Sequence, residues 1–297
     1  MRNLTQEWRN AALATLGLML VLFVPAMAGA QTLPPMPPQK VVSVYGQTIA
    51  YFEAGQGPNL LLLHGLGGDA GNWVLNIGPL SQSFHVYALD QVGFGHSAKP
   101  FIDYRIETFT DFLQEFMKVL NIPKATLVGN SLGGWIALDF AAHYPDHVDS
   151  LVLVDAAGLT PERLAPRPAV NLNAASLEGM RRVMEIIFYN KQIVTDEIVR
   201  HFYERHLQSG DGYTISRLLA TLFAGDQFED ASLASLRMPT LVVWGREDAL
   251  VPLSIGERFE KGISGARLAV IDQCGHVPQL EKPAEFNKTL QEFLARP

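Results

Sequence analysis

The sequence predicts an α/β protein with a mostly parallel central sheet that is covered by helices on both faces. Short, continuous apolar runs alternate with helix-like segments along much of the 297 residues. Apolar strands without polar alternation are buried on both faces, as is typical of parallel sheets. Because 48% of the residues are hydrophobic, a single domain with an insertion can bury a large core.

The expected elements follow from the spacing of apolar residues. Residues 40–52 predict a hairpin that turns at Gly46 and Gln47. Buried strands are expected at 60–63, 86–89, 125–128, 151–154, 241–243 and 267–272. Residues 107–120 carry apolar side chains at helical spacing, and 135–142 also favour a helix. Strands therefore alternate with helices over residues 40–158 and 238–297, which we expect to form the core.

A G-x-S-x-G sequence joins one of these strands to the next helix, with Gly129 and Gly133 around Ser131. A serine on such a tight turn has a strained backbone, and its hydroxyl is exposed beyond the sheet. The glycines leave room for neighbouring backbone. We therefore expect Ser131 to be a nucleophile. The backbone N–H of Leu132, at a helix N-terminus, is an expected oxyanion donor.

An acid and a histidine follow this serine in the chain, each after a predicted strand. A serine hydroxyl needs an imidazole to take its proton and a carboxylate to orient that imidazole. Asp248 is the expected acid, with Asp155 as a serious alternative, because it also ends a strand, and Glu247 as a weaker one. His276 is the expected base, because it lies in a loop between a late strand and a final amphipathic helix.

The loop at His64 and Leu66 follows an apolar strand and is rich in glycine. Such a loop can supply a second backbone N–H to an oxyanion, and Leu66 is the expected donor. For the side chain of His64 we favour a role in shaping the turn.

These segments together resemble the α/β-hydrolase fold family, over roughly residue 41 to the C-terminus. The resemblance implies an α/β-hydrolase fold and a Ser131–His276–Asp248 triad without a cofactor or metal. Within the family the sequence is similar to lidded bacterial serine hydrolases, which include esterases and meta-cleavage-product hydrolases that split carbon–carbon bonds. Dehalogenases and epoxide hydrolases of the family have aspartate in place of Ser131, so neither activity is expected.

Two positions differ from the pattern of the carbon–carbon hydrolases. That group has tryptophan after the catalytic histidine, where this chain has Val277, and an arginine in the lid at the position of Phe202. We therefore expect a carboxylic ester hydrolase that forms an acyl-enzyme, with carbon–carbon bond hydrolysis as the alternative. A second alternative is a non-catalytic protein of this fold that binds a small ligand.

The alternation of strands and helices stops between residues 159 and 237. This stretch predicts three helices, near 177–189, 195–206 and 213–223, and we expect it to form a lid over the site. An apolar pocket would favour small to medium hydrophobic substrates. The expected lining residues are Met180, Met184, Phe188, Phe202 and Val277.

Composition argues against several other functions. The net charge of −7 and the absence of a basic run disfavour nucleic-acid binding. No Walker loop, dinucleotide fingerprint or metal-ligand cluster is present in the sequence. The single cysteine, Cys274, excludes an internal disulfide and is expected to be buried. The triad and the apolar lid together make a small hydrophobic ester the expected partner.

The N-terminus resembles an export signal. Arg2 and Arg9 precede an uncharged apolar run, and small residues end at Ala30. We expect residues 1–30 to be a signal peptide cleaved after Ala30 or Ala28, and 31–39 to be a proline-rich linker. Glu7 is unusual in such a leader, so an uncleaved membrane anchor is the alternative. Contact with a membrane is expected only through this segment.

Overall fold

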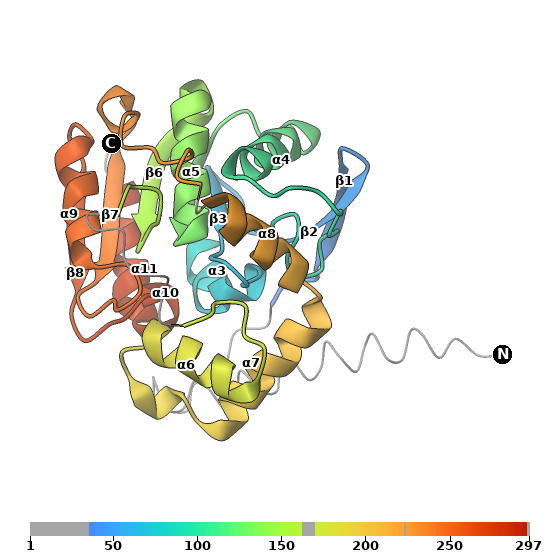
Figure 1. Cartoon of the computed structure of the whole chain (residues 1–297). Coiled ribbons are helices and arrows are strands. Elements are labelled where there is room, and N and C mark those ends of the chain that lie inside the picture. The colour runs from blue at the N-terminus through green and yellow to red at the C-terminus, as the bar shows by residue number, and fades with distance from the viewer. Residues whose placement is uncertain (1–35, 162–169, 223, 296–297) are drawn as a thin grey trace.

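An eight-stranded sheet forms the centre of the protein in the computed structural model, which describes residues 36–161, 170–222 and 224–295 (Figure 1). The spatial order is β1-β2-β4-β3-β5-β6-β7-β8. β2 pairs antiparallel with β1 and with β4, and the other pairs are parallel. The strands are β1 (Lys40–Val44), β2 (Gln47–Ala54), β3 (Asn59–Leu63), β4 (His85–Leu89), β5 (Ala125–Asn130), β6 (Val148–Val154), β7 (Thr240–Gly245) and β8 (Arg267–Ile271).

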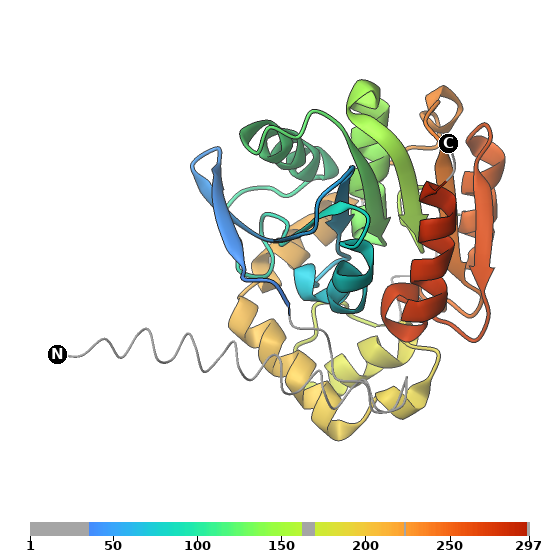
Figure 2. The same cartoon turned by 180° about the vertical axis from the view of Figure 1, so that it is seen from behind.

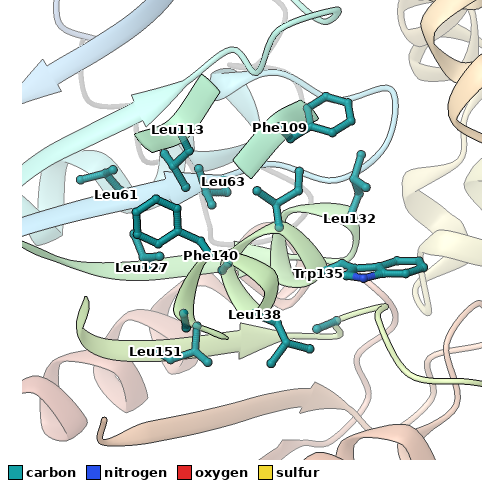
Figure 3. Packing of buried hydrophobic residues seen from close by; sticks show 14 of the residues in the cluster. Leu61, Leu63, Phe109, Leu113, Leu127, Leu132, Trp135, Leu138, Phe140 and Leu151 are labelled. Atoms are coloured by element: carbon teal, nitrogen blue, oxygen red, sulfur yellow. The ribbon is translucent and has the colours of Figure 1, made fainter. Parts of the chain in front are cut away.

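Helices cover both faces of the sheet, because successive side chains of each strand point to opposite sides. Leu61 and Leu63 of β3 belong to the apolar cluster on one face, and Leu60 and Leu62 belong to the cluster on the other. Figure 3 shows part of the first cluster. Helices that pack in this cluster include α4 (Ile106–Val119), α5 (Leu132–His143) and α9 (Leu253–Gly262). The other face carries α3 (Val74–Leu80) and α11 (Pro283–Leu294), which Figure 2 shows in front of the sheet.

Residues 159–237, where they are described, contain helices and no strand between β6 and β7. The elements are α6 (Leu177–Ile187), η3 (Lys191–Ile193), α7 (Asp196–Ser209), α8 (Gly212–Leu222) and η4 (Leu233–Ser235). Side chains define the helix starts: Ser176 accepts a hydrogen bond from the Gly179 N–H, and Thr195 from the Ile198 N–H. Gly210 ends α7 in the left-handed conformation. α6 and α7 lie beyond the carboxyl ends of the parallel strands (Figure 1).

Most expected elements occur within one to three residues of their expected bounds. The parallel sheet, its covered faces and the hairpin at Gly46 are confirmed. The expected leader, residues 31–35 of the linker and part of the expected lid lie outside the described residues. In the described ranges, no helix has the length and apolarity that crossing a membrane requires.

Candidate active site

The serine at the end of β5 lies on a strained turn. Ser131 has φ 56° and ψ −115°, and α5 begins at the next residue. A Cβ added at Gly129 would lie 2.1 Å from the Gly133 carbonyl oxygen, and one added at Gly133 would lie 2.2 Å from the Leu63 carbonyl oxygen. The backbone is therefore packed too closely for any side chain at either glycine. This turn presents Ser131, which is only partly buried, to a cavity.

The loop after β3 lies against this serine. A Cβ added at Gly65 would be 3.3 Å from the Ser131 Cβ. Leu66 and Leu132, the expected sources of oxyanion N–H groups, both line the same cavity as Ser131. The two expected donors and the expected nucleophile are thus close together.

His64 shapes this loop from a fully buried position. Its Nε2 accepts a hydrogen bond from the Gln91 backbone N–H at 3.0 Å, so Nδ1 carries the proton and donates to the Gly65 carbonyl at 2.8 Å. The Gln91 amide in turn donates to the His64 carbonyl at 2.7 Å. Burial lowers the pKa of His64 and keeps the ring neutral. The side chain has the structural role that we expected of it.

His276 and Asp248 form a buried pair. The distance between His276 Nδ1 and Asp248 Oδ2 is 2.7 Å. The other carboxylate oxygen of Asp248 accepts the backbone N–H groups of Leu250 and Val251 at 2.8 and 3.0 Å. His276 Nε2 is buried and has no hydrogen-bond partner among the described residues. The imidazole is therefore oriented by the carboxylate at one nitrogen and free to accept a proton at the other.

Several groups that the sequence analysis left without a role hold His276 near the serine. The Asn130 side-chain amide donates to the His276 carbonyl at 3.0 Å and to the Val154 carbonyl at 3.1 Å. The His276 N–H donates to the Ile187 carbonyl at 2.8 Å. Glu281 accepts the N–H of Gly275 at 2.8 Å. The histidine loop is thus tied both to the serine turn and to α6.

The alternative acids differ in their placement. Glu247 accepts the Cys274 backbone N–H at 3.0 Å, which gives it a structural role. Asp155 is fully buried beside Asp248 and His276 but forms no hydrogen bond with the imidazole, so Asp248 is the residue that orients the ring. Cys274 is buried as expected, and burial raises the pKa of its thiol, which keeps it protonated.

A cavity of about 370 Å³ contains Ser131 and His276 in its wall. The helices of residues 159–237 contribute much of the rest of its lining. All five expected lining residues are there, namely Met180, Met184, Phe188, Phe202 and Val277. Most of the side chains that line this cavity are apolar.

Charged side chains at another part of the wall were not expected from the sequence. Arg205 of α7 forms an ion pair with Asp69, which follows the glycine-rich loop. His206 and Asp211 also line the cavity, and His206 Nδ1 lies 3.1 Å from an Asp211 carboxylate oxygen. Arg205 is three residues after Phe202, so helical spacing would have placed it on the same face. Its partner is distant in the sequence and could not have been inferred.

Asp155, Asp248 and His276 are the one group of three potential metal ligands within the described ranges. The 2.7 Å contact between His276 and Asp248 is a direct hydrogen bond, and a metal ion would have to displace it. The arrangement therefore suits proton transfer better than metal binding.

This geometry is that of an α/β hydrolase. A family model described as the alpha/beta hydrolase fold matches residues 58–283, and the chain therefore belongs to that family. Its relatives and structural neighbours are hydrolase enzymes that act on small molecules, and the chain is accordingly a hydrolase.

The similar proteins are of two kinds. A 2-hydroxy-6-oxo-6-phenylhexa-2,4-dienoate hydrolase of Comamonas testosteroni is 34% identical over 83% of this chain and 91% of its own length. The structure of a meta-cleavage product hydrolase of Pseudomonas fluorescens IP01 has a TM-score of 0.75 at 32% identity, covering 86% of this chain and 97% of that one. The crystal structure of a membrane phospholipase A has a TM-score of 0.81 at 28% identity, covering 99% of this chain and 98% of that one.

Proposed function

We propose that this chain is a serine hydrolase that cleaves carboxylic esters. His276 Nε2 takes the proton of the Ser131 hydroxyl as its oxygen attacks the ester carbonyl. Asp248 stabilises the imidazolium, and the N–H groups of Leu66 and Leu132 stabilise the oxyanion. His276 then protonates the leaving alcohol, and a water molecule that the same imidazole activates releases the acid from Ser131.

One observation carries this proposal. Ser131 on its strained turn shares a cavity with His276, whose Nδ1 is bound to Asp248 and whose Nε2 has no partner among the described groups. That combination is what an imidazole needs to act as a general base toward a hydroxyl.

The lining of the cavity supports an ester with an apolar acyl group. Val277 and Phe202 occupy the two positions where carbon–carbon hydrolases carry tryptophan and arginine, and both line the cavity. Among the described lining residues, Arg205 is the only arginine or lysine, and its charge is paired with Asp69. A substrate carboxylate would have to compete with Asp69 for that cation.

The test compares Ser131→Ala with wild type on p-nitrophenyl esters of increasing acyl length. We expect kcat to fall by at least about 10⁴-fold with the fold intact. Ser83→Ala, at an exposed serine, is the matched control. A fluorophosphonate probe should label wild type and not Ser131→Ala. Normal ester turnover by Ser131→Ala would refute the proposal, and an unlabelled wild type would favour a ligand-binding protein.

Carbon–carbon bond hydrolysis is the second candidate, and the curated relatives favour it over ester hydrolysis. Two of them are named 2-hydroxy-6-oxo-6-phenylhexa-2,4-dienoate hydrolases and a third is named a 2-hydroxymuconate semialdehyde hydrolase, at 31% to 34% identity. The membrane phospholipase A, which aligns over nearly the whole chain, supports the ester instead. Comparing kcat/KM for p-nitrophenyl butyrate and 2-hydroxy-6-oxo-6-phenylhexa-2,4-dienoate separates the two. A preference for the dienoate by more than about tenfold would reverse our choice.

Residues 159–237 act as the lid in this proposal, with 40–158 and 238–297 as the core. Residues 1–30 direct export, and the linker 31–39 follows. The alternative is that residues 1–30 stay attached as an uncleaved membrane anchor. Fractionating cells that express the full chain tests this: a shortened protein in the soluble exported fraction indicates cleavage, and a full-length protein in the membrane fraction indicates an anchor.

A further inference from the structure

Asp155 is a buried acid that the proposed mechanism does not use. It follows β6, has an exposed fraction of 0%, and adopts φ 42°, a conformation that costs strain outside glycine. Its Oδ1 accepts the Gly245 N–H at 2.9 Å. Its Oδ2 is buried and has no hydrogen-bond partner among the described residues.

The adjacent parallel strand brings this acid to the proposed triad. The Asp155 N–H donates to the Val243 carbonyl of β7 at 3.0 Å, and β7 leads into Asp248. One oxygen of each carboxyl and one ring nitrogen of His276 all lie within 4.8 Å of one another. Asp155 is therefore the closest available substitute for Asp248, as their positions after neighbouring strands suggested.

Two ionised carboxylates cannot share such a site without a large electrostatic cost. Both oxygens of Asp248 already accept hydrogen bonds, one from two backbone N–H groups and the other from the His276 ring. Asp155 accepts only one N–H. Burial, together with the neighbouring Asp248, raises the pKa of Asp155 well above its usual range. The proton therefore belongs on Asp155, where it gives the unpaired oxygen a hydrogen bond to donate.

We propose that Asp155 is a positioning residue, a neutral carboxylic acid that donates a hydrogen bond to the Asp248 carboxylate and holds it toward His276. When Asp248 is replaced, Asp155 releases its proton to solvent and accepts the hydrogen bond from His276 Nδ1–H in its place. The inference rests on the proposed roles of Ser131, His276 and Asp248.

The test uses the full chain, an activated ester and four variants, D155A, D155N, D248N and the double variant D155N/D248N. We expect D155A to lower kcat about tenfold with KM within about twofold, because Asp248 loses its donor. D155N should recover most of that loss, since its amide donates to Asp248 and its oxygen still accepts from Gly245. In other triads, replacing the acid by its amide costs about 10⁴-fold. D248N should lose only about 10²-fold, and the double variant about 10⁴-fold.

The decisive outcome is that D155N lowers kcat only slightly in the wild-type background but lowers it strongly when combined with D248N. A purely structural role for Asp155 predicts the same fold-loss in both backgrounds. Equal rates for D248N and the double variant, or a wild-type kcat for D155A, would overturn the inference. Thermal unfolding of each variant separates a folding defect from lost turnover, and D155N carries the test if D155A does not fold. Normal ester turnover by Ser131→Ala would instead refute the proposed serine-hydrolase function.

Discussion

The side-chain amide of Asn130 donates a hydrogen bond to the backbone carbonyl of His276 at 3.0 Å. This contact joins the residue before the proposed nucleophile to the proposed base. The same amide binds the Val154 carbonyl at the end of β6. One buried side chain therefore fixes the spacing of two loops that are far apart in the sequence.

Asn130→Ala should slow turnover more than it destabilises the fold. It leaves the buried His276 carbonyl without a donor, which costs about 1–3 kcal/mol, whereas the Val154 carbonyl still accepts the Ser131 backbone N–H. The looser His276 loop should reduce kcat by about 10- to 100-fold. Asn59→Ala removes an exposed amide that binds the Lys124 carbonyl and is the control. Ester kinetics and chemical denaturation measure both effects, and an unchanged kcat would contradict the role of Asn130.

Gly129→Ala should prevent folding of the serine turn. The new Cβ would lie 2.1 Å from the Gly133 carbonyl oxygen, which belongs to rigid backbone. We expect a loss of at least about 3 kcal/mol in the free energy of unfolding, or insoluble protein. At Gly212 in α8 a Cβ would meet only the Asn173 side chain, at 3.4 Å. Gly212→Ala should therefore fold normally, and equal stabilities of the two variants would show that the turn relaxes.

His64 should make the protein less stable in mild acid. Its ring is neutral in the fold because burial lowers its pKa, whereas in the unfolded chain it takes up a proton below about pH 6.5. The unfolded state then binds more protons, so the free energy of unfolding falls as pH decreases through that value. Between about pH 7 and about pH 5, wild type should lose about 1 kcal/mol more than His64→Gln does.

Urea denaturation at several pH values measures this difference. His64→Gln should start from a lower stability at neutral pH, because the Gln91 N–H loses its acceptor. His147→Gln, which replaces an exposed histidine, is the matched control for the substitution. Identical slopes for wild type and His64→Gln would mean that the ring takes up its proton equally in the folded and unfolded states, which would contradict the prediction.

Arg205→Met should loosen α7 from the loop that follows β3. It breaks the ion pair with Asp69 and leaves that carboxylate without its cation, at a cost of about 1–2 kcal/mol because both groups are partly exposed. Arg200→Met, on an exposed part of the same helix, should cost less than about 0.5 kcal/mol. The double variant Asp69→Asn/Arg205→Met should recover part of the loss, and strict additivity would show that the pair is not coupled.

The elements that local pattern encodes were predictable. The placement of glycines or the spacing of apolar residues predicts the hairpin, the buried strands and the helix after Ser131. The helix α3 was not predicted, since Gly78 and Pro79 lie in it, and α9 was not singled out either. In each case tertiary packing of a few apolar side chains outweighs weak local preference.

Some residues of the site could likewise be predicted from local sequence, and others could not. Ser131, Asp248 and His276 lie in recognisable segments at the ends of strands, and the structure brings them to one region. The supporting contacts of Asn130, Glu281 and Arg205 depend on pairs that are distant in the sequence. No local pattern encodes such a pair, so these contacts emerge only once the fold is assembled.

Hydrogen bonds connect the histidine loop and the following Glu281 to the end of α6 and the residues after it. These bonds limit how the helices could be exchanged by engineering. The His276 N–H is bound to Ile187, while Glu281 accepts the N–H groups of Tyr189 and Asn190 at 3.2 and 2.7 Å. Grafting the helices of a relative onto this core would therefore disturb the proposed base unless residues 187–190 and Glu281 were transplanted together. A change in the helices that alters substrate range is therefore expected to alter turnover as well.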